Sequence, residues 1–259
     1  MNFKKYIIHL LFILCFSQIT LAVDRSPIEQ EAIDFYNEGV QFVIDGKYEE
    51  SILYFDKAIV KIPKFMKAYY TKGRILGQLK RYDDVIKNSD AALKLNIKQP
   101  RILTHKSVAL YALKKYKEGL KIAQLAVQYG NDVSIAYEAR ANAYAALGHY
   151  ELAISDYDKT LELVDDINNS NNAETYLNRF CPLYNLGRYL EALETCDKAL
   201  AITTTPNKLP QIYSKKAAVL NKLGRHNEAL EDANKALEIS LNDPLGISEK
   251  KIAISRLNK

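Results

Sequence analysis

The sequence predicts an all-α protein in which one helical hairpin is repeated along the chain. First, the stretch LGHYELAISDYDKTLEL at 147–163 has close copies that begin at Asp45, Leu186 and Leu223. Second, apolar residues in each copy recur every three or four positions, which is the period of an amphipathic helix. Third, the first four repeat units begin 34 residues apart. Repeats of this size cannot bury their apolar faces alone, so they are expected to stack on one another as a solenoid.

Residues 1–22 are predicted to be a secretory signal peptide. Lys4 and Lys5 precede an uncharged run of 17 residues that ends at Ala22, and small residues stand before the expected cleavage at Val23. The alternative is an uncleaved membrane anchor, but the run is shorter than the ~20 apolar residues that a spanning helix needs. We therefore expect 23–259 to be exported, to the periplasm or as a secreted protein.

The charge and cysteine content restrict the function classes. Removal of the signal peptide takes away two lysines and no acid, which leaves 34 Lys and Arg against 31 Asp and Glu. A balance this close does not favour binding to nucleic acid. Only Cys181 and Cys196 remain after cleavage, so the chain is not a disulfide framework, and whether these two pair is left open.

Each predicted element has its own signals. Ser26, Pro27 and Glu29 form a capping box with proline at the first helical position, so the first helix should begin near Pro27. In every unit, positions 4, 8 and 11 share one face of a first helix, and positions 17, 20, 24 and 27 share one face of a second. Small residues at positions 8, 20 and 27 would let the two axes approach within ~8–10 Å. The predicted units are 32–65, 66–99, 100–133, 134–167, 173–206 and 210–243.

The last segment, 244–259, is predicted to be an amphipathic capping helix that closes the stack. Ile247 and Ile254 are expected to point inward, and Glu249 is expected to lie in water. A solenoid needs such a polar end to stay soluble.

The repeat length and its order of aromatic and small residues resemble the tetratricopeptide repeat. Position 4 is held by Phe35, Tyr69, Leu103, Tyr137, Tyr176 and Tyr213, and position 27 by Ala58, Ala92, Ala126, Thr160, Ala199 and Ala236. The resemblance covers 32–243 and implies a right-handed α-α superhelical solenoid of six hairpins. Residues 23–259 would form one such domain, with its concave inner face free for a partner.

In the family that the chain resembles, peptides lie along the concave face and contact positions 2, 5, 6, 9, 12 and 13 of the first helices. The resemblance therefore implies a partner-binding groove lined by Lys67, Tyr70, Arg74, Arg101, His105, Tyr111, Asn142, Asn178, Tyr184 and Lys215. The first six of these make a basic and aromatic patch across units 2 and 3. Such a patch favours an extended partner with an acidic or carboxylate group.

Asn142, Asn178 and Lys215 match three positions of the family's carboxylate clamp, which holds a partner's C-terminal tail. Glu138 and Gln211, however, stand where that clamp has cations. A C-terminal carboxylate would meet a negative charge at Glu138, so this clamp is not predicted. The two asparagines remain candidate anchors for a peptide backbone, because an amide both donates and accepts hydrogen bonds.

Two departures from the family pattern are predicted to be structural. Position 7, often leucine in the family, is a cation in five units: Lys72, Lys106, Arg140, Arg179 and Lys216. Their stems are expected to cover a seam while their heads reach an acid such as Asp156 or Asp158. In unit 5, Phe180 replaces a small residue and Pro182 falls inside a helix, where it removes an N–H at a cost of ~3 kcal/mol. A kink that widens the groove is the hypothesis for this unit.

No catalytic constellation is visible. His105, His149 and His226 are scattered over three units without zinc-site spacing, and no nucleophile has a base in reach. The sequence therefore predicts no enzyme, no metal, no cofactor and no contact with a membrane except through partners. We interpret the chain as an exported adaptor or scaffold that binds a protein or peptide, for example in assembly of cell-envelope machinery. The alternatives are a solenoid that associates with itself and, more remotely, an exported enzyme; the oligomeric state is open.

Overall fold

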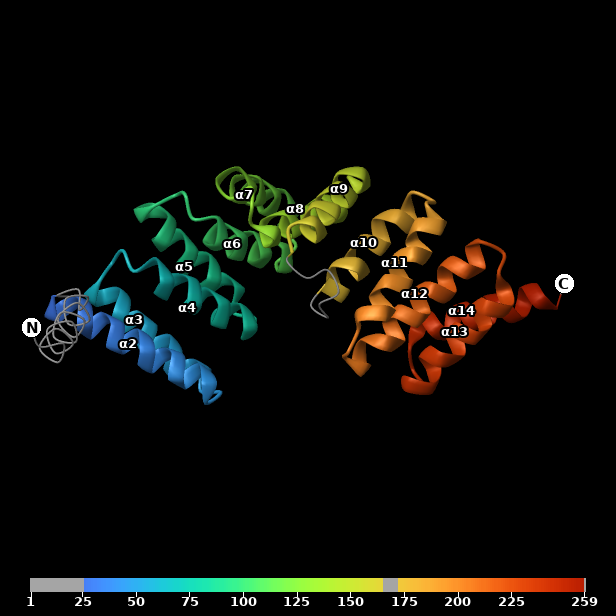
Figure 1. Ribbon diagram of the computed structural model, residues 1–259, viewed down its shortest axis with the longest axis horizontal. Coiled ribbons are helices and arrows are strands. Elements are labelled where there is room, and N and C mark those ends of the chain that lie inside the picture. Colours follow the sequence, from blue (N-terminus) through green and yellow to red (C-terminus); the bar gives the residue numbers. More distant parts are fainter. Residues whose placement is uncertain (1–25, 165–171, 259) are drawn as a thin grey trace, which may run out of the picture. The chain divides into compact units, whose positions relative to one another are not determined.

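The computed structural model describes residues 26–164 and 172–258, and these are helical with short turns and no strand (Figure 1). The predicted signal peptide lies outside the described residues. The described helices are α2 (Pro27–Ile44), α3 (Tyr48–Lys61), α4 (Met66–Gln78), α5 (Tyr82–Leu95), α6 (Pro100–Ala112), α7 (Tyr116–Tyr129), α8 (Ser134–Ala146), α9 (Tyr150–Glu162), α10 (Ala173–Asn185), α11 (Tyr189–Ile202), η2 (Pro206–Lys208), α12 (Leu209–Lys222), α13 (His226–Ile239) and α14 (Pro244–Leu257). The chain divides into two compact units, one that ends at Leu79 and one that begins at Lys80.

The first unit holds α2, α3 and α4. Its first helix begins at Pro27 as predicted, and both bonds of the capping box are present: Ser26 Oγ accepts from the Glu29 N–H at 3.2 Å, and the Glu29 carboxylate accepts from the Ser26 N–H at 2.9 Å. Gly39 lies against the ring of Phe55, where an added Cβ would stand 2.8 Å from a ring carbon. Glycine is therefore required at this position for α2 and α3 to pack so closely.

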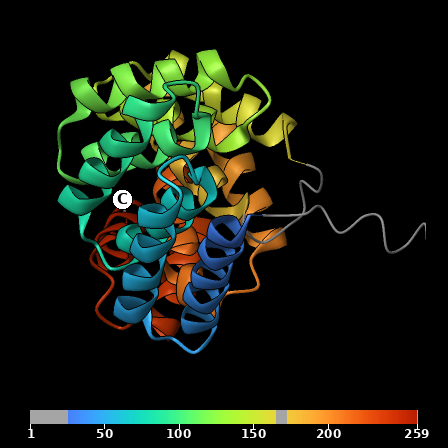
Figure 2. The same cartoon turned by 90° about the vertical axis from the view of Figure 1, so that its left-hand side faces the viewer.

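The second unit is a stack of hairpins in chain order (Figures 1 and 2). The pairs α6 with α7, α8 with α9, α10 with α11 and α12 with α13 pack within each hairpin, and α14 lies against α12 and α13. The first helices α6, α8, α10 and α12 also contact one another in this order. Together these first helices form one continuous layer, and we call its solvent-facing side the first-helix face.

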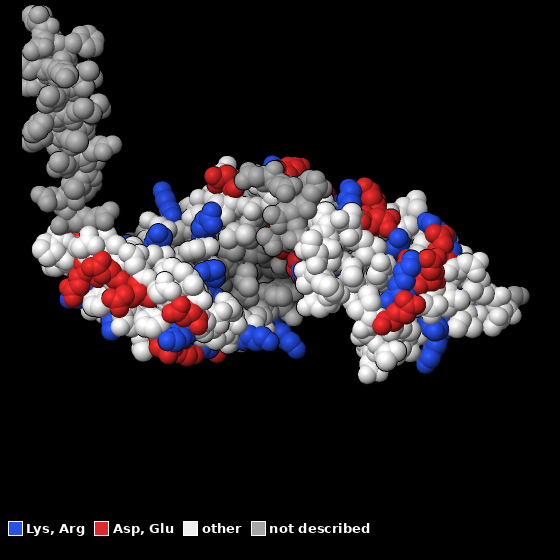
Figure 3. Space-filling model, turned by 60° about the horizontal axis from the view of Figure 1, so that its bottom comes forward, with Lys and Arg blue, Asp and Glu red and all other residues white. Residues whose placement is uncertain are grey.

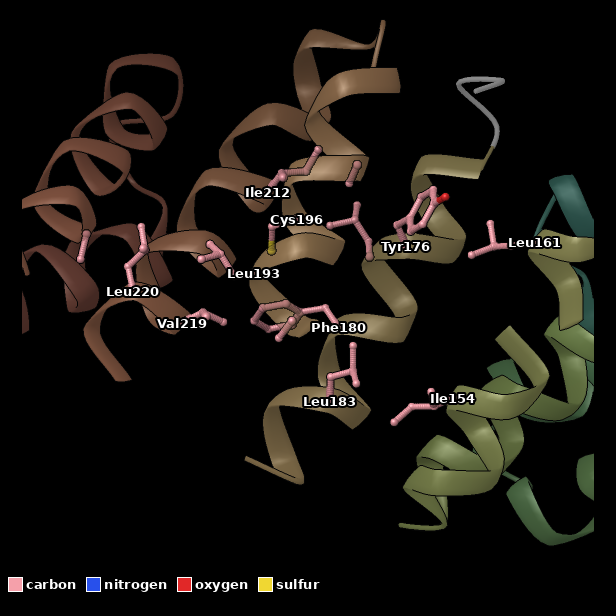
Figure 4. Packing of buried hydrophobic residues seen from close by; sticks show 14 of the residues in the cluster. Ile154, Leu161, Tyr176, Phe180, Leu183, Leu193, Cys196, Ile212, Val219 and Leu220 are labelled. Atoms are coloured by element: carbon pink, nitrogen blue, oxygen red, sulfur yellow. The ribbon is translucent and has the colours of Figure 1, made fainter. Parts of the chain in front are cut away.

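A cluster of buried hydrophobic residues runs through α9 to α14, with most of its members on α10, α11 and α12 (Figure 4). It includes Phe180, which is 5% exposed and stands where the repeat pattern has a small residue. The matching position of the second helix, α11, carries Cys196. In the first unit the sizes are reversed, because Phe55 on α3 lies opposite Gly39 on α2. The bulky side chain has changed sides of the hairpin, which keeps the packed volume similar.

Helix α10 continues through Pro182 to Asn185, and Pro182 is fully buried. The helix is therefore not broken at this residue, and a widened groove at unit 5 stays a prediction. Both cysteines of the region are free: Cys181 on α10 is exposed, and Cys196 on α11 is buried. Their different environments agree with the predicted register, in which Cys181 faces outward and Cys196 faces the core.

Cations at position 7 form ion pairs along the seam between consecutive hairpins. Four of them reach an aspartate of the preceding hairpin: Lys72 to Asp56 (2.5 Å), Lys106 to Asp90 (2.5 Å), Arg179 to Asp158 (2.7 Å) and Lys216 to Asp197 (2.7 Å). Arg140 instead bonds Asp156 of its own hairpin through two nitrogens, both at 2.7 Å, because the preceding hairpin has Gln124 at the matching position. The predicted seam role of these cations, with Asp156 and Asp158 as acids, is confirmed. Figure 3 shows acids and cations lying beside one another on one side of the molecule.

The capping helix α14 is present, but its predicted orientation is wrong. Ile247 and Ile254 are 36% and 40% exposed, while Glu249 is only 8% exposed and its carboxylate accepts from Asn221 Nδ2 at 2.9 Å. The inward side of α14 is formed by Gly246 and Ala253, which let its backbone lie close to the preceding hairpin. Close approach by small residues therefore outweighed burial of the two isoleucines.

Candidate partner-binding face

The predicted groove residues lie on first helices in both units. Lys67, Tyr70 and Arg74 are on α4 of the first unit, where Lys67 Nζ lies 4.9 Å from the ring centroid of Tyr36 and Arg74 is exposed. Arg101, His105 and Tyr111 are on α6 of the second unit. Each group is placed within its own unit, so their union into one patch stays a prediction.

Tyr111 belongs to a cluster that the sequence did not predict as a unit. The cluster consists of Tyr111 on α6, Glu138 and Asn142 on α8, Tyr157 on α9 and Cys181 on α10, and we call it the Glu138 cluster. The Tyr157 hydroxyl donates to Asn142 Oδ1 at 2.6 Å, and the Tyr157 side chain is almost fully buried. Burial raises the pKa of Tyr157, and the nearby Glu138, Tyr111 and Cys181 add to the rise. Four helices thus bring their side chains within electrostatic reach of one another.

Glu138 is the unusual member of this cluster. Burial raises the pKa of its carboxyl group, the Thr175 hydroxyl opposes this by donating at 3.4 Å, and the nearby Glu174 raises the pKa further. Glu174 has its own cation, since Lys208 Nζ lies 2.8 Å from its carboxylate. Within the described parts of the chain, no Lys, Arg or His forms an ion pair with Glu138. The sequence identified the charge of Glu138 as a mismatch, but its burial depends on side chains from α10 and could not be predicted.

The remaining predicted residues lie nearby on α10 and α12. Lys215 Nζ is 4.5 Å from the ring centroid of Phe180 and 3.3 Å from Cys181 Sγ. Tyr184 stacks on Phe180 with centroids 5.5 Å apart. Asn178 on α10 is half-buried. The structure therefore brings Lys215 and Cys181 together, and Cys181 also belongs to the Glu138 cluster.

A shallow pocket with many charged residues lies on another side of the second unit, between α8, α9 and α11. Four of its charged residues pair with one another, Arg140 with Asp156 and Lys159 with Glu162 at 2.9 Å. Most of the charge in this lining is therefore satisfied without a ligand. In the described residues, no three side chains among His, Cys, Asp and Glu gather as a metal site would require. The described helices also include none that is long and apolar enough to span a membrane.

The family of the repeats follows from comparison with known proteins. The family model described as Tetratricopeptide repeat matches residues 67–96, 135–163 and 210–243. These three segments are similar to tetratricopeptide repeats. In the matched segments 135–163 and 210–243 the residues form the two helices of one hairpin, α8 with α9 and α12 with α13.

The curated relatives match this chain over only part of their length. Dynein axonemal assembly factor 4 of Pongo pygmaeus and that of Pan paniscus are each 30% identical over 136 residues, which is 50% of this chain and 32% of the relative. The chain thus spans about a third of the length of these curated relatives.

Solved structures confirm the predicted fold class, an all-α solenoid of tetratricopeptide hairpins. The Cut9–Hcn1 hetero-tetramer of APC/C matches with a TM-score of 0.75 at 18% identity, over 90% of this chain and 44% of that one. PilF of Pseudomonas aeruginosa matches with 0.71 at 15% identity, over 90% and 100%. YrrB, a tetratricopeptide repeat protein with an unusual peptide-binding site, matches with 0.61 at 19% identity, over 76% and 97%. At these identities the likeness concerns the fold alone.

Proposed function

We propose that this chain is a non-catalytic adaptor that holds a partner peptide or protein segment on its first-helix face. The observation that carries this is the character of that face in the second unit, where Val108 and Tyr111 are 47% and 39% exposed beside the half-buried amides of Asn142 and Asn178. Apolar and aromatic surface next to amides suits an extended chain, which needs both packing and backbone hydrogen bonds. The repeats themselves form a scaffold fold of the protein-interaction type.

The partner is proposed to carry an acidic group that meets Lys67, Arg74 and Arg101. Affinity capture with the chain as bait tests this, with a variant that changes these three residues to Glu. A matched control carries Lys87→Glu, Lys121→Glu and Lys198→Glu, which change the net charge equally but lie on the second helices α5, α7 and α11. We expect the first variant to lose the partner and the control to keep it, with unchanged size in light scattering. Equal capture by both variants would reject the acidic partner.

Export is the second part of the proposal, and it rests on the composition of residues 1–22. An exported adaptor would reach cell-envelope machinery, whose assembly is the role we propose for it. Intact-mass measurement on the protein isolated from its own cells tests the export step. The expected species begins at Val23; a chain that keeps residues 1–22 in full would reject cleavage.

A second candidate, association of one copy with another, is favoured by the charges of two helices. Helix α2 contains Glu29, Glu31, Asp34 and Glu38 and no Lys or Arg, whereas α14 contains three cations and a single, buried acid. An acidic helix of one copy could attract the basic helix of the next in a head-to-tail contact. Light scattering at low and high salt tests this, because such a contact weakens as salt screens the charges. A mass that stays that of one chain at low salt would reject it.

A further inference from the structure

Glu138 lacks the cationic partner that several other acids within the hairpin stack of the second unit have. Asp156, Asp158 and Asp197 each lie within 2.7 Å of a cation from a neighbouring helix. Glu174, next to Glu138, is paired with Lys208. Glu138 receives only a long hydrogen bond, from the Thr175 hydroxyl at 3.4 Å. Among the described residues of this region, the fold supplies a cation to each of these acids and none to Glu138.

A carboxylate in this position is costly to the folded chain. Removing a charged group from water is unfavourable unless an opposite charge and hydrogen bonds replace the lost hydration. The hydroxyl of the nearby Tyr157 donates to Asn142 Oδ1 and not to Glu138. The folded chain by itself thus leaves the acceptor capacity of the Glu138 carboxylate largely unused.

The surroundings of Glu138 suit a long cationic side chain. Tyr111 offers an aromatic ring that is 39% exposed, and aromatic rings attract ammonium and guanidinium groups. Val108, on the same helix, is 47% exposed and can cover the methylene stem. Lys215, the cation that α12 places near Cys181 of this cluster, lies over Phe180 and against Cys181 Sγ.

We propose that the Glu138 cluster receives a lysine or arginine side chain of the partner segment, whose cationic head pairs with the Glu138 carboxylate beside the ring of Tyr111. This rests on the proposed function, since it gives the chemistry of one contact on the same face. It adds a basic residue to a partner that was expected, from Lys67, Arg74 and Arg101, to carry an acid. The partner segment therefore has charges of both signs, and the order of these charges would fix its direction along the helices.

The test uses a random linear peptide library displayed on phage and selected on the purified chain. The strongest enriched peptide is synthesised with its basic residue intact and with that residue changed to glutamine, and affinities are measured by fluorescence anisotropy. We expect enriched peptides to share a Lys or Arg. We also expect Glu138→Gln to weaken the basic peptide about tenfold, as loss of a partly desolvated charge pair does, and to leave the glutamine peptide unchanged. Glu194→Gln on α11, an exposed acid paired with Lys198, is the matched control and should change neither affinity.

A charge exchange makes the test reciprocal. Glu138→Lys should reject the basic peptide, because like charges repel, and should accept a version in which glutamate replaces the basic residue. The four affinities form a double-mutant cycle, which isolates the pairwise attraction. If Glu138→Gln binds the basic peptide as well as the original chain does, while Tyr111→Ala or Arg101→Glu weakens it, the inference is wrong and the proposed face stands. If variants at all three positions bind equally well, the peptides bind elsewhere and both proposals fail.

Discussion

Charge is handled in opposite ways on two sides of the second unit. On the side where the position 7 cations lie, Arg179 and Lys216 each meet an aspartate of the preceding hairpin, and Arg140 meets one of its own hairpin, all at 2.7 Å. On the first-helix face, Glu138 meets only the Thr175 hydroxyl at 3.4 Å. Paired seam charges fix how one hairpin sits on the next, whereas an unpaired charge on the face lowers stability and leaves binding capacity. Under the proposed function, stability and recognition belong to two sides of the same helices.

The largest expected difference between the face and the interior concerns its two thiols. Burial raises the pKa of the Cys196 thiol to about 12, and Cys181 is exposed on the face. Because only the thiolate reacts, alkylation of Cys196 at pH 8 should be about a thousandfold slower than that of a solvated thiol. Mass spectrometry of native protein treated with iodoacetamide should show label on Cys181 first, and unfolding in urea should make both react. Equal native labelling would mean that the core around α11 opens readily.

Among the ion pairs of the position 7 cations, loss of the acid at Asp156 should lower the free energy of unfolding most. Its side chain is 7% exposed, and Asp156→Ala leaves the Arg140 guanidinium without its acid. Loss of one partner of a buried pair typically costs 3–5 kcal/mol, and the partial exposure of Arg140 favours about 3 kcal/mol here. The loss should appear as a lower urea midpoint followed by circular dichroism. Asp158→Ala is the control: this side chain is 46% exposed, so its loss should cost about 1 kcal/mol or less.

The face should respond in the opposite direction when its charge is removed. Glu138→Gln keeps the shape but removes an unpaired, half-buried carboxylate, so we expect it to stabilise the fold by about 1 kcal/mol at pH 7. Burial raises the folded pKa of Glu138 above its ordinary value of 4.5, so between pH 4.5 and the folded pKa the folded chain binds more protons than the unfolded chain. Stability of the original chain therefore falls as pH rises from 4.5 through the folded pKa.

The pH dependence makes this prediction specific. The gain from Glu138→Gln should be absent below pH 4.5, where the carboxyl is protonated in both states, and should grow above it. Thermal unfolding of both proteins at several pH values measures the difference. Glu194→Gln, which removes an exposed acid, should show no such trend. A gain that is the same at every pH would show that charge is not its cause.

The sequence was sufficient for features that depend on spacing and insufficient for those that depend on contact between helices. The start of α2 at Pro27 follows from local hydrogen bonds of the capping box, and position 7 cations at a seam follow from the repeat period. Glu249 was wrongly predicted to lie in water, because its burial depends on Gly246 and Ala253, which let α14 lie close to the preceding hairpin. The burial of Phe180 opposite Cys196 likewise depends on contact between helices. The lack of a cationic partner for Glu138 could not be predicted from the sequence either, because it depends on which side chain of α10 lies near the carboxylate.

The smallest expected effect sharpens the comparison within the seam. Lys106 bonds Asp90 through one nitrogen, and the Asp90 side chain is 45% exposed, whereas Arg140 holds a buried acid with two. Lys106→Met keeps the apolar stem over the seam and removes only the charge, so the free energy of unfolding should fall by about 0.5 kcal/mol or less. Lys106→Ala also removes the stem and should cost more than Lys106→Met. Urea midpoints of the two variants measure this. If Lys106→Met cost as much as Asp156→Ala, each ion pair of the position 7 cations would stabilise the fold equally. The bidentate pair of Arg140, which forms where Gln124 replaces the usual aspartate, would then contribute no more than the others.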